Sequence, residues 1–153
     1  MSPARTAPLL VAAGAAVVLA GCSGPTAEGA ATPQAAVTTF FHALGGKDSA
    51  GACAVISTGG RPLNGVPLQQ CALGFDKVLA GLGDQQDITA LAGATVTGAT
   101  VTGDRATVTR AQITKVPEGF QNDIDLVRVE GRWYIDSKAD PTDTGSPTDG
   151  ATG

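Results

Sequence analysis

The spacing of apolar positions divides this chain into a helical first half and a strand-forming second half. After residue 32, apolar side chains recur every three or four residues, which is the spacing of one helix face. The pair Thr32-Pro33 precedes this run as a capping residue and a proline in the first turn, and predicts that a helix begins there. From Thr89 onward the period falls to two, which predicts strands. The apolar face of the first helix consists of Val37, Phe40, Phe41 and Leu44.

Two further helices are predicted before the strands. A short one starts at Asp48-Ser49 and carries Cys53 and Ile56. A longer one runs from Pro67 to Leu82 and ends at Gly83. The stretch "STGGRPLNG" between them has paired glycines and a proline, and predicts an irregular connection. The apolar stripe of the longer helix consists of Leu68, Cys71, Phe75, Val78 and Leu79.

The strand half contains two hairpin signals. In "ATVTGDRATVT" the turn falls at Gly103-Asp104, and Gly98 marks a bend before the hairpin. In "DIDLVRVEGRWYID" the turn falls at Glu130-Gly131, and both faces of the strand pair are apolar, which is typical of the middle of a curved sheet. The dry face of the first hairpin consists of Ala99, Val101, Ala106 and Val108. The two faces of the second consist of Ile124, Leu126, Trp133 and Ile135, and of Val127, Val129 and Tyr134.

Helices followed by an antiparallel meander predict an α+β fold, with the N-terminal helices packed on a curved antiparallel sheet. The segments "AAVTTFFHALGGKDSAGACAVIS", "CALGFDKVL" and "LVRVEGRWYID" together resemble the small nuclear transport factor 2-like lipoproteins of actinobacteria. The resemblance covers residues 33–137 and implies a cystatin-like cone. The alternatives are another small α+β fold or an all-β domain preceded by helices.

The first 21 residues have the layout of an export signal. Arg5 lies in a short polar start, and the apolar stretch "APLLVAAGAAVVLAG" follows. This stretch is short for a membrane span, which needs about 17–25 apolar residues. Residues 1–21 are therefore predicted to be a signal peptide.

The signal ends in Leu19-Ala20-Gly21-Cys22, which resembles the lipobox of bacterial lipoproteins. This resemblance implies cleavage between Gly21 and Cys22 and a diacylglyceryl thioether on the Cys22 sulfur. The protein would then be lipid-anchored at the extracytoplasmic face of the cell membrane. The alternative is an ordinary secretory signal with an incidental cysteine.

Small and polar residues flank the predicted domain, which spans residues 33–138. Residues 22–32 are predicted to be a flexible tether, and a linker of about 10 residues has a root-mean-square reach of about 17 Å. Residues 139–153 contain no large apolar side chain, and we expect this tail to be disordered.

The charge of the chain disfavours nucleic acid as a partner. The net charge is −4, and loss of Arg5 with the signal peptide would make it −5. An acidic domain is not held to an anionic membrane by its overall charge, so the covalent lipid is the expected membrane contact.

Three cysteines are present, and lipidation of Cys22 would leave Cys53 and Cys71 as an even pair in an exported protein. A disulfide between them would stabilise the domain by about 3 kcal/mol in the loop-entropy model. The alternative is a pair of buried free thiols.

With one histidine in the chain and no close cysteine spacing, a zinc site lacks ligands.

The sequence contains no catalytic constellation. Cone folds of the resembled superfamily include isomerases, dehydratases and polyketide cyclases, which place an acid or base inside the cone. His42 falls off the apolar helix face, and Asp123, Asp125 and Asp136 lie at strand positions where a carboxylate is usually solvated. We therefore assign no catalytic residue, no metal ligand and no cofactor.

Four aromatic residues are candidates for lining a pocket in the cone: Phe41, Phe75, Trp133 and Tyr134. The alternative is that these side chains form the core. The sequence thus favours a non-catalytic binding or interaction domain whose partner is an envelope protein or a small apolar ligand. A carrier of such a ligand is the second hypothesis, and an isomerase or dehydratase is the third.

Overall fold

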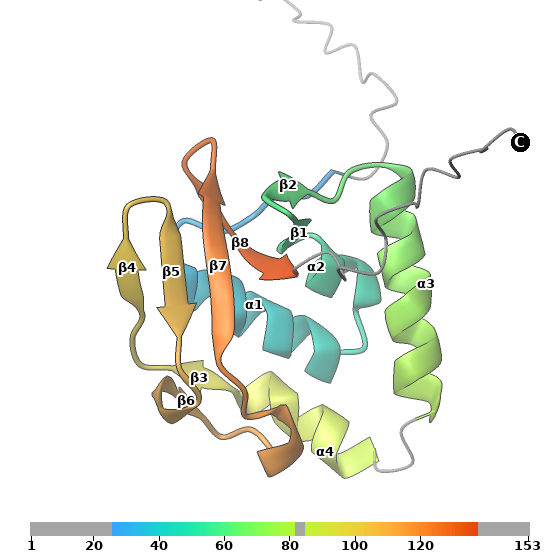
Figure 1. Ribbon diagram of the computed structural model, residues 1–153. Coiled ribbons are helices and arrows are strands. Elements are labelled where there is room, and N and C mark those ends of the chain that lie inside the picture. Colours follow the sequence, from blue (N-terminus) through green and yellow to red (C-terminus); the bar gives the residue numbers. More distant parts are fainter. Residues whose placement is uncertain (1–25, 82–84, 138–153) are drawn as a thin grey trace, which may run out of the picture.

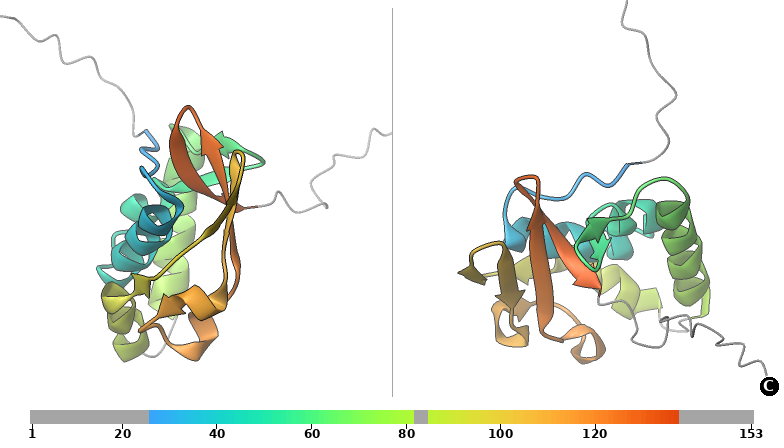
Figure 2. Two further views of the ribbon diagram at one scale, coloured as in Figure 1. Left: turned by 90° about the vertical axis from the view of Figure 1, so that its left-hand side faces the viewer. Right: turned by 45° about the horizontal axis from the view of Figure 1, so that its top comes forward.

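The computed structural model describes residues 26–81 and 85–137, which form two layers (Figure 1). Helices cover one face of a twisted sheet, as the side view in Figure 2 shows. The helices in these ranges are α1 (Pro33–Gly45), α2 (Ser49–Cys53), α3 (Val66–Gly81) and α4 (Gln85–Ala90), with 3-10 turns η1 (Leu91–Gly93), η2 (Arg110–Gln112) and η3 (Glu118–Phe120). The strands there are β1 (Ile56–Thr58), β2 (Arg61–Pro62), β3 (Thr95–Val96), β4 (Thr100–Thr102), β5 (Arg105–Val108), β6 (Ile113–Thr114), β7 (Ile124–Val129) and β8 (Arg132–Ser137).

The fold is α+β, as predicted, but the main sheet is mixed rather than wholly antiparallel. Its strand order is β2-β1-β8-β7-β5-β4, and β1 runs parallel to β8. The hairpin signals predicted only the antiparallel pairs, because they report contacts between neighbours in sequence. The β1–β8 pair joins Ile56 to Ile135 across most of the domain.

Helix α1 begins and ends as its sequence predicts. The Thr32 side chain accepts a hydrogen bond from the Ala35 amide at 3.1 Å, and Pro33 occupies the first turn. The helix ends at Gly45. A Cβ atom on this residue would lie 2.2 Å from the Ala92 amide nitrogen. This close approach requires glycine and brings η1 against the end of α1.

The hydrophobic core lies between α1 and the sheet. Helix α1 contributes its predicted face, with Phe40 partly buried, and the sheet contributes the inward side chains of β5, β7 and β8. Residues around α4, η1 and β6 close one end of this core. The most buried members include Val37, Phe41, Leu126, Val108, Ile88 and Leu91.

The segment after α2 differs from its prediction. Helix α2 ends at Cys53, and Ile56 opens β1 instead of continuing the helix. The stretch predicted to be irregular forms the β1–β2 hairpin, with Gly59 and Gly60 at positive φ. The helical assignment of Ile56 was wrong because pairing with β8 determines the conformation there.

Both predicted hairpins are confirmed, with the predicted turns and registers. One side chain departs from the predicted dry face: Val101 is 51% exposed although Ala106 opposite it is buried. Strand β4 is the edge of the sheet and all three of its residues are exposed, so the helix layer does not cover it.

The prediction of strands from Thr89 onward was wrong at its start, because Thr89 belongs to α4 and η1 follows. The apolar side chains of Ile88 and Leu91 are almost fully buried, and this burial fixes the helical segment. Gly98 lies between β3, which pairs with β6, and β4, which joins the main sheet. It therefore marks the passage between two sheets.

Candidate functional site

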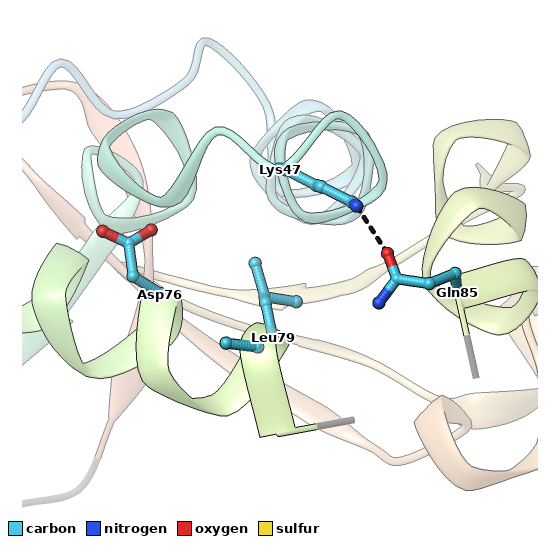
Figure 3. A pocket seen from close by; sticks show the side chains of 5 residues that line it. Lys47, Asp76, Leu79 and Gln85 are labelled. Carbon is cyan, nitrogen blue, oxygen red and sulfur yellow. Dashed lines mark hydrogen bonds between the residues drawn. The ribbon is translucent and has the colours of Figure 1, made fainter. Parts of the chain in front are cut away.

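A cleft of about 260 Å³ opens on the helix side of the domain, between the turn after α1, helix α3 and the start of α4 (Figure 3). Lys47 is placed there by the end of α1: it adopts φ 58°, and its amide donates to the Leu44 carbonyl at 3.0 Å. This left-handed residue turns the chain after the helix. The Lys47 ammonium then donates to Gln85 Oε1 at 2.5 Å. The cleft is lined by Lys47, Asp76, Leu79, Ala80 and Gln85.

The opposite side of the cleft carries a carboxylate. Asp76 of α3 accepts a hydrogen bond from Ser49 Oγ at 2.5 Å, and Ser49 is 5% exposed. Leu79 lies between the Lys47 and Asp76 side chains in Figure 3. The cleft thus presents a cation, a carboxylate and an apolar surface, a combination that can hold a small polar molecule.

A second hollow, of about 330 Å³, lies along the flank of α3 and is almost wholly apolar. It is shallow and open, and Cys71, Gly74, Phe75 and Val78 line it. Cys71 is joined by a disulfide to Cys53 of α2, with the Cα atoms 6.0 Å apart, which is the pairing predicted from the sequence.

The four predicted pocket aromatics do not share one site. Phe41 and Trp133 are buried in the core between α1 and the sheet. Phe75 packs edge-on against Phe40, with ring centroids 5.8 Å apart, and lines the apolar hollow. Tyr134 is buried on the opposite face of the sheet from Trp133.

Tyr134 packs against the chain segment that precedes α1. A Cβ atom at Gly29, which adopts φ 56°, would lie 2.5 Å from the Tyr134 ring. Burial raises the pKa of the Tyr134 hydroxyl above its usual value of 10.0, while the Arg132 charge lowers it and the Glu130 charge raises it further.

The carboxylate of Asp136 is largely buried, with its side chain 6% exposed. Its Oδ1 accepts hydrogen bonds from Ser57 Oγ and the Gly60 amide, and its Oδ2 pairs with Arg105 at 3.3 Å. These contacts tie the β1–β2 turn and β5 to β8. Asp136 therefore acts as a structural link on the face of the sheet away from α1.

The other titratable candidates are hydrogen-bonded separately. Asp123 accepts from the Arg110 amide at 2.8 Å, and Asp125 accepts from Thr107 Oγ1 at 3.0 Å. His42 Nε2 lies 3.0 Å from the Ala94 carbonyl oxygen, on the helix side. Within residues 26–81 and 85–137, no three His, Cys, Asp or Glu side chains are grouped to hold a metal ion.

The lipobox residues Gly21 and Cys22, the signal peptide 1–21 and the tail 139–153 lie outside the described residues.

Part of the predicted tether is described, and it is bound to the domain. The Glu28 and Gly29 amides donate to the Ala54 carbonyl, and Ala30 and Trp133 exchange backbone hydrogen bonds of 2.9 and 2.8 Å. The fixed part of the domain thus begins before Pro33. No described helix is both long and apolar enough to cross a membrane.

Sequence reasoning missed the cleft because its residues come from segments far apart in the chain. The glycines of "GGKD" mark the end of α1, but no local signal shows that Lys47 shares a cleft with Asp76 and Gln85. Comparison of the chain with protein-family models, curated proteins and solved structures finds no match.

Proposed function

We propose that this protein is a membrane-anchored lipoprotein of the cell envelope with a non-catalytic binding or interaction domain. The observation that carries the proposal is Leu19-Ala20-Gly21-Cys22 at the end of a short apolar run. A lipobox needs the cysteine as its acceptor, and small residues before it suit cleavage. Two acyl chains on one residue make a stable anchor, because each buried methylene contributes about 0.8 kcal/mol.

The disulfide supports an extracytoplasmic location for the domain. Cys53 and Cys71 are bonded, and disulfides persist in oxidising compartments and are rare in the cytosol. This observation is independent of the signal segment, so two features of the chain favour export.

The α+β arrangement is compatible with a nuclear transport factor 2-like cone, which we include in the proposal. An aromatic helix packs across a twisted sheet that closes with the Gly131-Arg132-Trp133-Tyr134 strand. The hydrogen bonds of Asp136 favour a non-catalytic domain, because they commit its oxygens to Ser57, Gly60 and Arg105.

The apolar hollow on α3 favours a second candidate function, the carriage of a small apolar ligand. Phe75 and Val78 give it an almost wholly apolar surface. A hydrophobic fluorescent dye should bind there, and Val78→Asp should abolish that binding, whereas Val101→Asp on β4 should not. Equal dye binding by both variants would exclude this hollow as the ligand-binding site.

Membrane fractionation of a Cys22→Ala variant tests the lipoprotein proposal. The unaltered protein should sediment with membranes and yield an N-terminal peptide carrying a diacylglyceryl group in mass spectrometry. Cys22→Ala should release the protein, whereas the neighbouring control Ser23→Ala should leave it bound. Unchanged fractionation of Cys22→Ala would refute the proposal.

A further inference from the structure

Helix α3 exposes large apolar side chains on the face directed away from its buried residues. Val66 is 63% exposed and Leu73 is 60% exposed. They are seven residues apart, so their directions around the helix differ by only about 20°. The buried residues Leu68 and Leu79 point to the other side, toward α2 and the core. Val66 and Leu73 therefore form one outward face, which we call the outer face of α3.

The outer face carries one lysine, and the acid of this helix, Asp76, lies at its edge. Its other members by helical position are exposed: Gln69, Gln70 and Lys77, with Ala80 at the rim of the cleft that Lys47 and Asp76 also line. The one acid on the helix, Asp76, is hydrogen-bonded to Ser49 of α2. In a chain with a net charge of −4, an apolar face with one lysine, whose neighbouring acid Asp76 is bound to Ser49, is compatible with phospholipid headgroups.

The chain enters the domain beside the start of this helix. The Ala27 amide donates to Asn64 Oδ1 at 2.8 Å, and Asn64 precedes Val66 by two residues. Figure 1 shows the same arrangement: the first described segment (blue) begins near the upper end of α3 and runs from there toward α1. The chain therefore enters the domain at the α3 end.

Few residues lie between Cys22 and the first described residue, Thr26. Thr26 is four positions after Cys22, and four steps of fully extended chain span at most about 14 Å. Helix α3 has 16 residues and is about 24 Å long, so a lipid on Cys22 keeps one end of the helix within reach of the bilayer surface. Once one end is held there, contact of Val66 and Leu73 with the same surface is an intramolecular event and needs little affinity of its own.

We propose that the outer face of α3 lies against the phospholipid surface of the membrane that holds Cys22. This inference rests on the proposed lipidation. It adds an orientation: α3 faces the membrane, and the β4 edge of the sheet, at the opposite side of the domain in Figure 1, faces away from it. A second copy of the chain or an envelope protein could cover the same face, but neither explains why the tether is short and enters at this helix.

The test uses the full lipidated chain, reconstituted into vesicles of three parts phosphatidylcholine to one part phosphatidylglycerol. An environment-sensitive fluorophore is attached at Gln70→Cys on the outer face or at Thr102→Cys on β4; both positions are exposed. An aqueous quencher then measures accessibility. The label at residue 70 should be quenched several-fold less than the label at residue 102, and its emission should shift to the blue.

Substitution of the apolar residue separates contact from mere proximity. In the Gln70→Cys background, Leu73→Glu should restore quenching, because a carboxylate is expelled from the headgroup region. Val101→Glu is the matched control, since Val101 is also an exposed apolar residue, at 51%, but lies on β4. It should leave the protection unchanged.

Equal quenching at residues 70 and 102 in protein that stays bound to vesicles would overturn the orientation and leave the lipid anchor intact. A chain without the diacylglyceryl mass on its Cys22 peptide would overturn the proposed function and this inference with it. Protection that appears in the soluble Cys22→Ala chain without vesicles, and grows with protein concentration, would assign the face to a second copy instead.

Discussion

Helices α1 and α3 have similarly apolar sequences but are held in the domain by different means. Helix α1 lies across the sheet and buries five of its 13 residues, whereas α3 buries two of 16. The buried residues of α1 are Pro33, Ala36, Val37, Phe41 and Leu44, and those of α3 are Leu68 and Leu79.

The attachments of α3 compensate for its small buried surface. Its main packing partner is α2, to which the Cys53–Cys71 disulfide and the Ser49–Asp76 hydrogen bond also join it. Helix α1 is held mainly by apolar burial, and α3 depends more on covalent and polar links. This difference leaves the outer face of α3 available for another surface.

The largest expected effect on stability comes from removing a core side chain of α1. Phe41 is 2% exposed, so Phe41→Ala should lower the free energy of unfolding by about 3–5 kcal/mol. Leu73→Ala on the exposed face of α3 should change it by less than about 0.5 kcal/mol. Equilibrium urea unfolding measures both. Similar losses for the two variants would contradict the contrast between the helices.

Removal of the disulfide should act chiefly on α3. Cys53→Ala combined with Cys71→Ala should cost about 3 kcal/mol of stability. In hydrogen exchange, the amides of α3 should lose more protection than those of α1, because α1 keeps its apolar contacts. A uniform loss of protection would show that the disulfide supports the whole domain equally.

Loss of the polar link between α2 and α3 should have a smaller effect. Ser49→Ala removes the donor to Asp76 and should cost about 1 kcal/mol, with faster exchange confined to α2 and α3. Asp76→Asn keeps an acceptor oxygen and serves as the control. If Asp76→Asn lowers the free energy of unfolding as much as Ser49→Ala does, the stabilisation comes from the charge of Asp76 rather than from the hydrogen bond.

The smallest effect concerns the sheet side and appears only at high pH. Because the folded pKa of Tyr134 is raised above 10.0, the unfolded chain loses the tyrosine proton first. Stability should therefore fall as pH rises from 10.0 toward the folded pKa, and Tyr134→Phe should reduce that fall. Tyr134 is the one tyrosine in the chain, so phenolate absorbance follows its titration directly. Identical high-pH profiles for the two proteins would contradict the shift.

Periodicity predicted the elements that are stabilised by their neighbours in sequence. Thr32 and Pro33 start α1 through a local cap, and Gly103 and Gly131 allow the positive φ that their turns need. The same reasoning failed at Ile56 and Thr89. There, pairing with β8 and burial at the end of the core determine the conformation.

The candidate cleft could not be predicted as a unit. Lys47, Asp76 and Gln85 belong to the turn after α1, to α3 and to α4, and only the folded arrangement of these segments brings them around one opening. Likewise, alternation along β8 predicted that Trp133 and Tyr134 lie on opposite faces. It did not predict which of these faces the helices cover. The packing of α1 against Trp133 makes that distinction.

The sequence by itself determined the lipobox prediction at Cys22, the helix and hairpin signals, and the pairing predicted for Cys53 and Cys71, because each depends on local spacing or on counting. The tertiary structure decided that β1 runs parallel to β8, that residues 27–30 are bound to the domain, and that α3 exposes Val66 and Leu73. The physical reason is that strand pairing and burial depend on surfaces contributed by distant segments, which meet only in the folded chain.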